Sequence, residues 1–156
     1  MNAIDLKTRV IEPVLRDAHL YSEAAVNLIL GTAAQESHMG KYFVQINGPA
    51  VGVFQMEPAT HDDIWQNFLA YQGGKRHTEM LRGMCGPYPP EASNMFWHLR
   101  YAALMCRVHY LRKPHKLPDA DDIEGLGAYW KVHYNTHLGK GTIDEFVENY
   151  RRFVLA

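Results

Sequence analysis

The chain has 156 residues, of which 47% are hydrophobic and 12% aromatic, and its formal net charge at pH 7 is −1. This length suits one domain with a substantial core, so we expect residues 1–156 to form a single domain and not a disordered chain. A charge so close to zero argues against nucleic-acid binding driven by charge, and no stretch reaches the roughly eighteen consecutive apolar residues of a membrane span. Neither nucleic acid nor a membrane is therefore an expected partner.

The N-terminal residues contain no apolar signal-peptide core, so we expect the protein to be made in the cytoplasm. Residues 4–18 have apolar side chains at helical spacing around Pro13, which predicts a kinked helix or two short helices. Cys85 and Cys106 are too few for a disulfide framework or a zinc site, and we expect them to be free thiols.

The most apolar segment, residues 22–39, predicts a buried helix. Ser22 is a favourable N-cap, and Gly40 supplies the left-handed residue that commonly ends a helix. Apolar side chains occur on nearly all faces between them, which is typical of a helix enclosed by the rest of the chain. Glu36 continues a buried stripe near the end of this helix, because it follows Ile29 by two turns.

A carboxyl in that position is a candidate acid catalyst. Burial disfavours the ionised form and raises the pKa unless a cation or several N–H donors compensate. An ordinary glutamate is protonated about one time in 500 at pH 7, whereas one with a pKa of about 6 is protonated roughly one time in ten. A general acid requires such a gain, although an isolated glutamate near a helix end more often extends its carboxyl into water.

The remaining chain predicts further helices around this one. Asn47-Gly48-Pro49 marks a turn in the irregular segment 40–57, where we expect a short hairpin or an extended loop. Thr60 is predicted to cap the next helix, and Thr142 with Glu145 to form the capping box of the last one. The helices are expected at about 60–70, 75–82, 91–113, 121–134 and from 142 onward. The fold class is therefore mainly α, with about six or seven helices around a buried central helix and a small hairpin or loop insert.

Three motifs occur in order along the chain. Glu36-Ser37 ends the buried helix, the segment from Gly52 to Thr60 follows an irregular stretch, and Tyr134-Asn135 precedes a glycine-bearing turn. In this order and spacing the chain resembles the soluble lytic transglycosylases and the goose-type lysozymes. Their motifs read Glu-Ser, Gly-Leu-Met-Gln-(aliphatic)-x-Pro-x-Thr and Ala-Tyr-Asn-Ala-Gly. The resemblance covers about residues 33–141, and the short chain is more similar to phage-encoded members than to bacterial ones.

The resemblance implies a lysozyme-like fold with the insert lining a cleft for the glycan strand of peptidoglycan. Glu36 would protonate the oxygen between N-acetylmuramic acid and N-acetylglucosamine. The same carboxylate would then accept the proton of the sugar's own 6-hydroxyl, which gives a 1,6-anhydro product. This reaction needs neither a second carboxylate nor a cofactor. We expect a monomer that acts on the cell wall, either as part of a phage virion or after release at lysis.

The resemblance also implies substrate-binding roles for the other motif residues. Ser37 would orient the Glu36 carboxyl or contact a sugar. Phe54, at the family's methionine position, would wall the site and keep it dry, and Gln55 would offer its amide to the glycan.

The third motif leaves the identity of the site tyrosine open. Tyr134 would direct its hydroxyl at the catalytic carboxyl, and Asn135 would hold the following turn or touch a sugar. However, the residues flanking this pair differ from the family pattern. A second register aligns Ala128-Tyr129 with the family's Ala-Tyr pair, which makes Tyr129 the alternative.

Other functions fit parts of the sequence. A lysozyme-type hydrolase would need a second carboxylate about 6.5–9.5 Å from the first, for which Glu57, Asp62 and Asp63 are candidates. A non-catalytic phage protein of the same fold that binds glycan or another protein is a second alternative, and a chitinase-like or chitosanase-like enzyme is a third.

The nine histidines do not predict a metal site. His133 and His137 are spaced i, i+4, but the helix is expected to end between them, and no His-Glu-x-x-His sequence is present. The three tryptophans, Trp65, Trp97 and Trp130, are compatible with sugar stacking, yet aromatic residues at helical spacing more often belong to a core, so the sequence assigns them no role.

Overall fold

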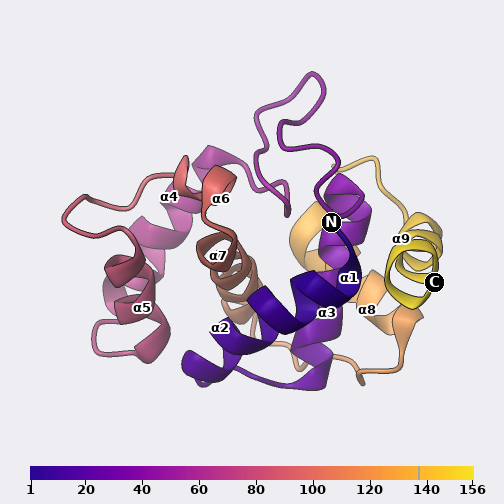
Figure 1. Cartoon of the computed structure of the whole chain (residues 1–156), viewed down its shortest axis with the longest axis horizontal. Coiled ribbons are helices and arrows are strands. Elements are labelled where there is room, and N and C mark those ends of the chain that lie inside the picture. Colours follow the sequence, from indigo (N-terminus) through magenta and orange to yellow (C-terminus); the bar gives the residue numbers. More distant parts are fainter. Residues whose placement is uncertain (137) are drawn as a thin grey trace.

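The computed structural model describes residues 1–136 and 138–156, and this part of the chain is mainly helical (Figure 1). It contains no β-strand, only isolated antiparallel bridges between Val44 and Val51 and between Val51 and Met56. The mainly α fold class is therefore confirmed. No helix of the described residues is long and apolar enough to cross a membrane.

The central element is α3 (Glu23–Ser37), which packs against helices from both ends of the chain. On one side lie α8 (Ile123–Trp130) and α9 (Ile143–Tyr150), and α7 (Leu99–Leu111) runs on the other side. In Figure 1, α4 (Pro58–Asn67) and α5 (Arg76–Met84) lie beyond α7, away from α3.

The N-terminal segment forms α1 (Ala3–Asp5), the π-helical turn η1 (Leu6–Ile11) and α2 (Glu12–Asp17) in succession. Pro13 is the second residue of α2, and the residues before it in η1 keep a helical backbone, so its missing N–H removes one hydrogen bond from this helical run. The π-helical turn that precedes it takes the place of the kink that the sequence predicted.

The start of α3 is as the sequence predicted, whereas its end differs. The Ser22 side chain accepts a hydrogen bond from the Ala25 N–H at 3.0 Å, and most of the helix is buried. The left-handed conformation begins at His38 (φ +49°) and continues through Met39 (φ +61°) to Gly40 (φ +82°). The chain therefore turns away directly after Ser37, two residues earlier than predicted.

Two other boundaries differ from the sequence-based expectation. Glu57 is the N-cap of α4 and Pro58 its first residue, so Thr60 lies inside the helix and does not cap it. The expected helix 91–113 is divided into α6 (Asn94–Trp97) and α7 by His98, which has an extended backbone. The His98 Nδ1 accepts the Tyr101 N–H at 3.2 Å and so starts a new helix in place of continuing the old one.

The C-terminal elements close over α3. After α8 come the π-helical turn η3 (Lys131–Asn135), α9 and the π-helical turn η4 (Arg151–Leu155). The Thr142 hydroxyl accepts the Glu145 N–H at 3.1 Å, which is the predicted N-cap of α9. The Glu145 carboxylate lies 3.5 Å from the Gln35 Nε2.

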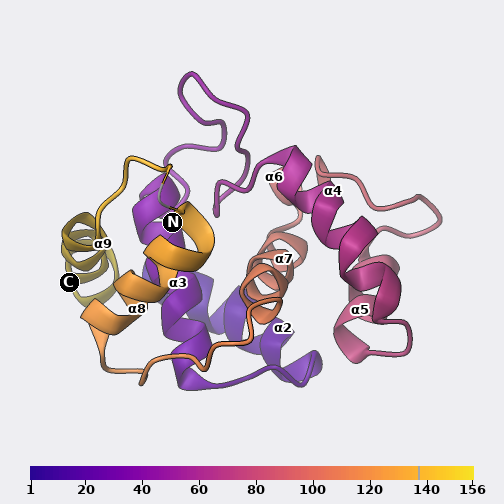
Figure 2. The same ribbon diagram turned by 180° about the vertical axis from the view of Figure 1, so that it is seen from behind.

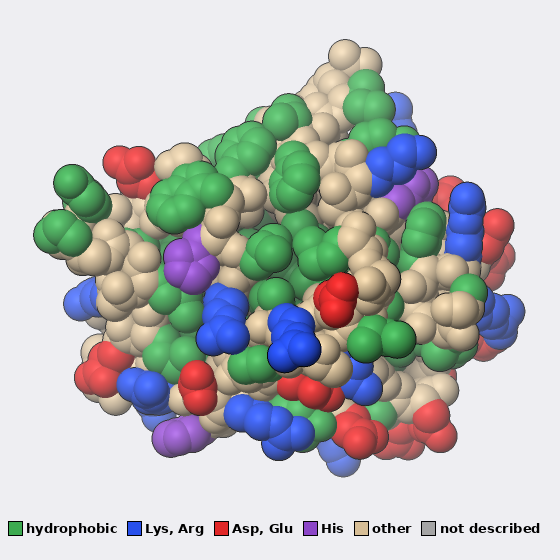
Figure 3. All heavy atoms as spheres, viewed as in Figure 1, with side chains coloured by type: hydrophobic (Ala, Val, Ile, Leu, Met, Phe, Trp, Pro, Cys, Tyr) green, Lys and Arg blue, Asp and Glu red, His purple; other side chains and the backbone are tan. Residues whose placement is uncertain are grey.

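The segment between α3 and α4 projects from the helical body (Figure 2). A Cβ at Gly52 would lie 2.5 Å from the Met95 carbonyl oxygen, so this segment packs closely on α6. On the face shown in Figure 3, hydrophobic side chains gather over the middle and upper part, whereas charged ones follow the lower edge. The exposed large hydrophobic residues of the segment and of α6 are Phe43, Val44, Ile46, Phe96 and Trp97.

Candidate active site

Glu36 lies in the last turn of α3 and is partly buried. Its Oε1 accepts a hydrogen bond of 2.9 Å from the indole Nε1 of Trp130, the last residue of α8. The two residues are 94 positions apart in the sequence. In Figure 2 the end of α8 lies beside the C-terminal end of α3, as this contact requires.

The electrostatic surroundings favour the protonated form of this carboxyl. Burial raises the pKa of Glu36 from its ordinary value of 4.5 to about 7, and the hydrogen bond from Trp130 opposes this rise. Burial is the larger influence because a carboxylate loses the solvation of both oxygens, whereas one neutral N–H donor replaces only part of it. Glu36 is thus the carboxyl that the sequence singled out, and its proton affinity suits a general acid near neutral pH.

Ser37 is fully buried, and its hydroxyl is committed to the backbone. It donates to the Val53 carbonyl and accepts the Gly40 N–H at 2.8 Å. The side chain therefore fastens the end of α3 to the segment that leads to Phe54. Ser37 therefore holds these two segments together. In the described part of the chain its hydroxyl forms no hydrogen bond with the Glu36 carboxyl.

Phe54 and Gln55 occupy a tight turn beside this junction. Phe54 is buried in the hydrophobic core, and its role as a wall of the site stays a prediction. Gln55 has a left-handed backbone (φ +48°), and its Nε2 donates to the Gly52 carbonyl at 2.9 Å. The amide nitrogen thus stabilises the turn. Binding of glycan by the remaining amide atom, Oε1, stays a prediction.

Tyr134 lies in η3 close to Glu36, but its hydroxyl donates its hydrogen bond to another group. Its hydroxyl donates to the Phe54 carbonyl at 2.6 Å, so the expected direct hydrogen bond to Glu36 is not formed. Its ring lies 5.3 Å from that of Tyr110, and burial raises the pKa of the Tyr134 hydroxyl well above its ordinary range. The tyrosine of the third motif therefore joins η3 to the Gly52–Thr60 motif, while Trp130 supplies the hydrogen bond to the acid.

The other two residues of this motif region point to different partners. The Tyr129 hydroxyl donates to the His115 carbonyl at 2.9 Å, which ties α8 to the segment before it. The Asn135 Oδ1 accepts a hydrogen bond of 2.6 Å from the Lys131 Nζ, which also donates to the Gly139 carbonyl. Asn135 thus holds the following turn, one of the two roles that the resemblance implies for it.

The alternative carboxylates are exposed, and two of them have cationic or imidazole partners. Asp63 pairs with Arg112 at 2.7 Å, and hydrogen bonds from Asn67 and Arg112 lower its pKa. Asp62 lies 2.9 Å from the His61 Nδ1. Glu57 is exposed and is the N-cap residue of α4, with no side-chain hydrogen bond to the helix.

The described residues contain no group of three or more histidine, cysteine, aspartate or glutamate side chains that could hold a metal ion. His133 stacks on His115 at 5.1 Å between ring centroids, and His137 lies outside the described residues. Cys85 and Cys106 are free thiols, as predicted.

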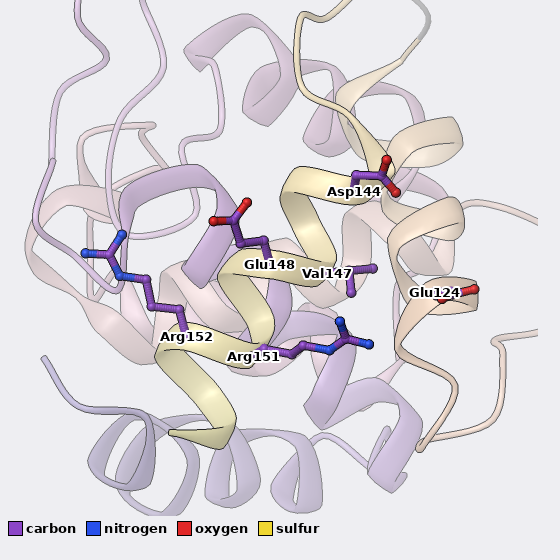
Figure 4. Close-up of a pocket in the computed structure, with 6 residues that line it drawn as sticks. All are labelled: Glu124, Asp144, Val147, Glu148, Arg151 and Arg152. Atoms are coloured by element: carbon purple, nitrogen blue, oxygen red, sulfur yellow. The ribbon is translucent and has the colours of Figure 1, made fainter.

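Two open depressions lie in the C-terminal part of the molecule, and both reach Asp144. One of about 570 Å³ follows α9 and α8, and its lining carries both acidic and arginine side chains, Glu124, Asp144, Glu148, Arg151 and Arg152, with Val147 between them (Figure 4). The other, of about 580 Å³, is lined by Lys131, Gly139, Lys140, Gly141, Thr142, Ile143 and Asp144. In Figure 4, Glu148 and Arg152 extend to one side and Arg151 extends toward the side of Glu124. The three acidic residues of this first depression, Glu124, Asp144 and Glu148, are exposed, so it offers no buried acid.

The second depression adjoins the acid site through Gly141. A Cβ at that position would lie 2.6 Å from the Trp130 Cη2 and 3.2 Å from the Gln35 Nε2. The loop before α9 therefore rests on the tryptophan that binds Glu36. The sequence missed Trp130 because an apolar residue of a helix carries no sign of a single polar contact to a distant helix.

Comparison of the chain with protein-family models, with curated protein sequences and with solved structures found no match in any of the three.

Proposed function

We propose that this protein is a peptidoglycan-cleaving glycosidase of lysozyme-like fold, a lytic transglycosylase, with Glu36 as its general acid and base. The observation that carries the proposal is the partly buried carboxyl at the end of α3 whose pKa is raised to about 7. About half of such carboxyls hold a proton at pH 7, compared with about one in several hundred for an ordinary glutamate. The order of the motifs around it supports the choice of glycan as substrate.

The reaction proceeds in two proton transfers at the same residue. Glu36 gives its proton to the glycosidic oxygen as the bond from the anomeric carbon to that oxygen breaks. The carboxylate then takes the proton from the 6-hydroxyl of the same sugar as its oxygen bonds to the anomeric carbon. The proton count of the enzyme is restored, and no water is consumed.

The surroundings of two of the three alternative acids, Asp62 and Asp63, favour this route over hydrolysis. An inverting hydrolase needs a second carboxylate that holds a water molecule across the scissile bond. Asp62 and Asp63 are exposed and engaged by His61 and Arg112, so neither is presented as a free base. A single acid that serves twice fits this arrangement better.

Digestion of purified cell walls tests the proposal. The wild-type protein is expected to release muropeptides with 1,6-anhydro ends, read by mass spectrometry, and folded Glu36→Gln is expected to lose at least a hundredfold in rate because it has no proton to give. Glu57→Gln is the matched control and should retain activity.

Reducing ends in the products would show a hydrolase instead. Saturable wall binding without cleavage at any pH from 4 to 9 would favour the non-catalytic alternative. Equal rates for wild type and Glu36→Gln would exclude the role assigned to Glu36.

A further inference from the structure

The hydrogen bond between Trp130 and Glu36 has a fixed direction. An indole carries one N–H donor and no acceptor, so it can bind only an oxygen that offers a lone pair. The Trp130 Nε1 lies 2.9 Å from the Glu36 Oε1. If Glu36 carried its proton on Oε1 and this proton pointed toward the indole, the two hydrogens would face each other and the hydrogen bond would be lost.

We propose that Trp130 is the positioning residue of the acid: its indole N–H holds Oε1 as an acceptor and so confines the transferable proton to Oε2. This inference rests on the proposed function, because it assigns the oxygen from which the glycosidic oxygen is protonated. In the second transfer the proton of the 6-hydroxyl binds to Oε2 again, because the indole stays bound to Oε1 throughout.

The tryptophan is itself held so that it cannot turn away. It is fully buried, and its ring lies 5.5 Å from that of Phe146 on α9. On the other side, the backbone at Gly141 approaches so closely that a Cβ there would lie 2.6 Å from the Trp130 Cη2. Lys131 fastens this loop through Asn135 and the Gly139 carbonyl. A rigid donor of this kind costs little reorganisation when charge develops on the carboxyl.

Three titratable groups around the carboxyl stay neutral while it ionises. Cys106 and Tyr110 on α7 and Tyr134 on η3 surround it, and burial raises the pKa of all three. Of the charged side chains on η3 and α9, Lys131 donates to the Asn135 Oδ1, and the Glu145 carboxylate lies 3.5 Å from the Gln35 Nε2. We therefore expect the chemical shift of the Trp130 indole N–H to change when Glu36 ionises.

The first test follows the indole N–H signals of the 15N-labelled wild-type protein by NMR from pH 5 to 9. The Trp130 signal is expected to shift with a midpoint near 7 and to stay constant with pH in Glu36→Gln, where the carboxyl cannot ionise. Trp65 is the built-in control, because its N–H donates to the Tyr101 hydroxyl at 3.0 Å. A Trp130 signal that does not titrate, or that titrates unchanged in Glu36→Gln, would overturn the inference. This readout needs no enzymatic activity, so it stands apart from the proposed function.

The second test removes the N–H and keeps the shape. Site-specific replacement of Trp130 by benzothienylalanine puts sulfur in place of the N–H in a bicyclic ring of nearly the same size. We expect kcat on cell walls to fall about tenfold to a hundredfold with KM little changed, as for one lost hydrogen bond to a charged group. The basic limb of kcat/KM should move to higher pH.

Trp65→Phe is the matched control for this second test. It also loses an indole hydrogen bond and should become less stable while keeping the pH profile of the wild type. A benzothienylalanine protein with an unchanged kcat and an unchanged basic limb would show that Trp130 serves only as a core residue.

Discussion

Burial and one hydrogen bond act in opposite directions on the carboxyl of Glu36. Burial raises its pKa to about 7, and the hydrogen bond from the Trp130 N–H makes this rise smaller. A pKa near the working pH gives the best compromise between holding a proton and releasing it. The same residue must do both in a transglycosylase, so a stronger or a weaker acid would slow one of the two steps.

This raised pKa also predicts a cost in stability. The folded protein binds a proton at Glu36 more tightly than the unfolded chain, so the free energy of unfolding falls as the pH rises from about 4.5 through 7. Glu36→Gln cannot ionise and keeps an oxygen for Trp130. We expect it to be more stable than the wild type by about 1 to 3 kcal/mol at pH 8 and about equal to it at pH 4.5, as measured by urea unfolding. A stability difference that does not change with pH would contradict the assigned pKa.

The sequence predicts the acid more readily than its partners. Glu36 stands out because a charged residue interrupts an apolar helix, a signal local to residues 22–39. Trp130 cannot be found in this way, since its contact joins residues 94 positions apart. The roles of Ser37 and Tyr134 likewise depend on which carbonyls, those of Val53 and Phe54, the fold brings beside their hydroxyls.

Among the elements, the packing of α9 against α3 and α8 depends on two glycines. The Phe146 ring of α9 occupies the space where Gly31 of α3 and Gly127 of α8 lack a side chain. A Cβ at Gly31 would overlap the Phe146 Cζ, and one at Gly127 would lie 3.0 Å from its Cδ1. This close approach sets α9 and the loop before it over Trp130.

Gly31→Ala is therefore expected to destabilise the protein by about 1 to 3 kcal/mol, because a well-packed core must move to admit the methyl group. Gly83→Ala is the matched control. Gly83 also lies in a helix, α5, but an added Cβ there meets nothing within 4 Å, so the change should be neutral or stabilise by up to about 1 kcal/mol. Thermal unfolding of both variants checks this, and equal melting temperatures would contradict the packing described.

Helix boundaries could be predicted where a local rule decides them. Ser22 and Thr142 cap their helices as expected, because an N-cap needs only a short polar side chain at the right position. The break at His98 was not predicted, since 91–113 has no internal proline or glycine and reads as one helix. There the His98 side chain caps α7 from within an otherwise helical sequence.

In the whole molecule, α3 is the structural axis and also carries the acid. Its N-terminal end is capped by Ser22, and its C-terminal end meets η3, α8 and the Gly52–Thr60 segment at one place. A hydrophobic pattern predicts that such a helix is buried but not which distant segments cover it. The mainly α class was therefore accessible from the sequence, whereas the meeting of these four segments required the structure.

The most direct measurement of the central claim is a carbon-13 NMR titration of the Glu36 carboxyl in the glutamate-labelled wild-type protein, assigned with Glu36→Gln. A midpoint near pH 7 is the predicted result, since burial at the end of α3 keeps the proton on the carboxyl up to neutral pH. A midpoint near 4.5, the value of a glutamate in water, would contradict the account, because such a residue would hold almost no proton to give at neutral pH.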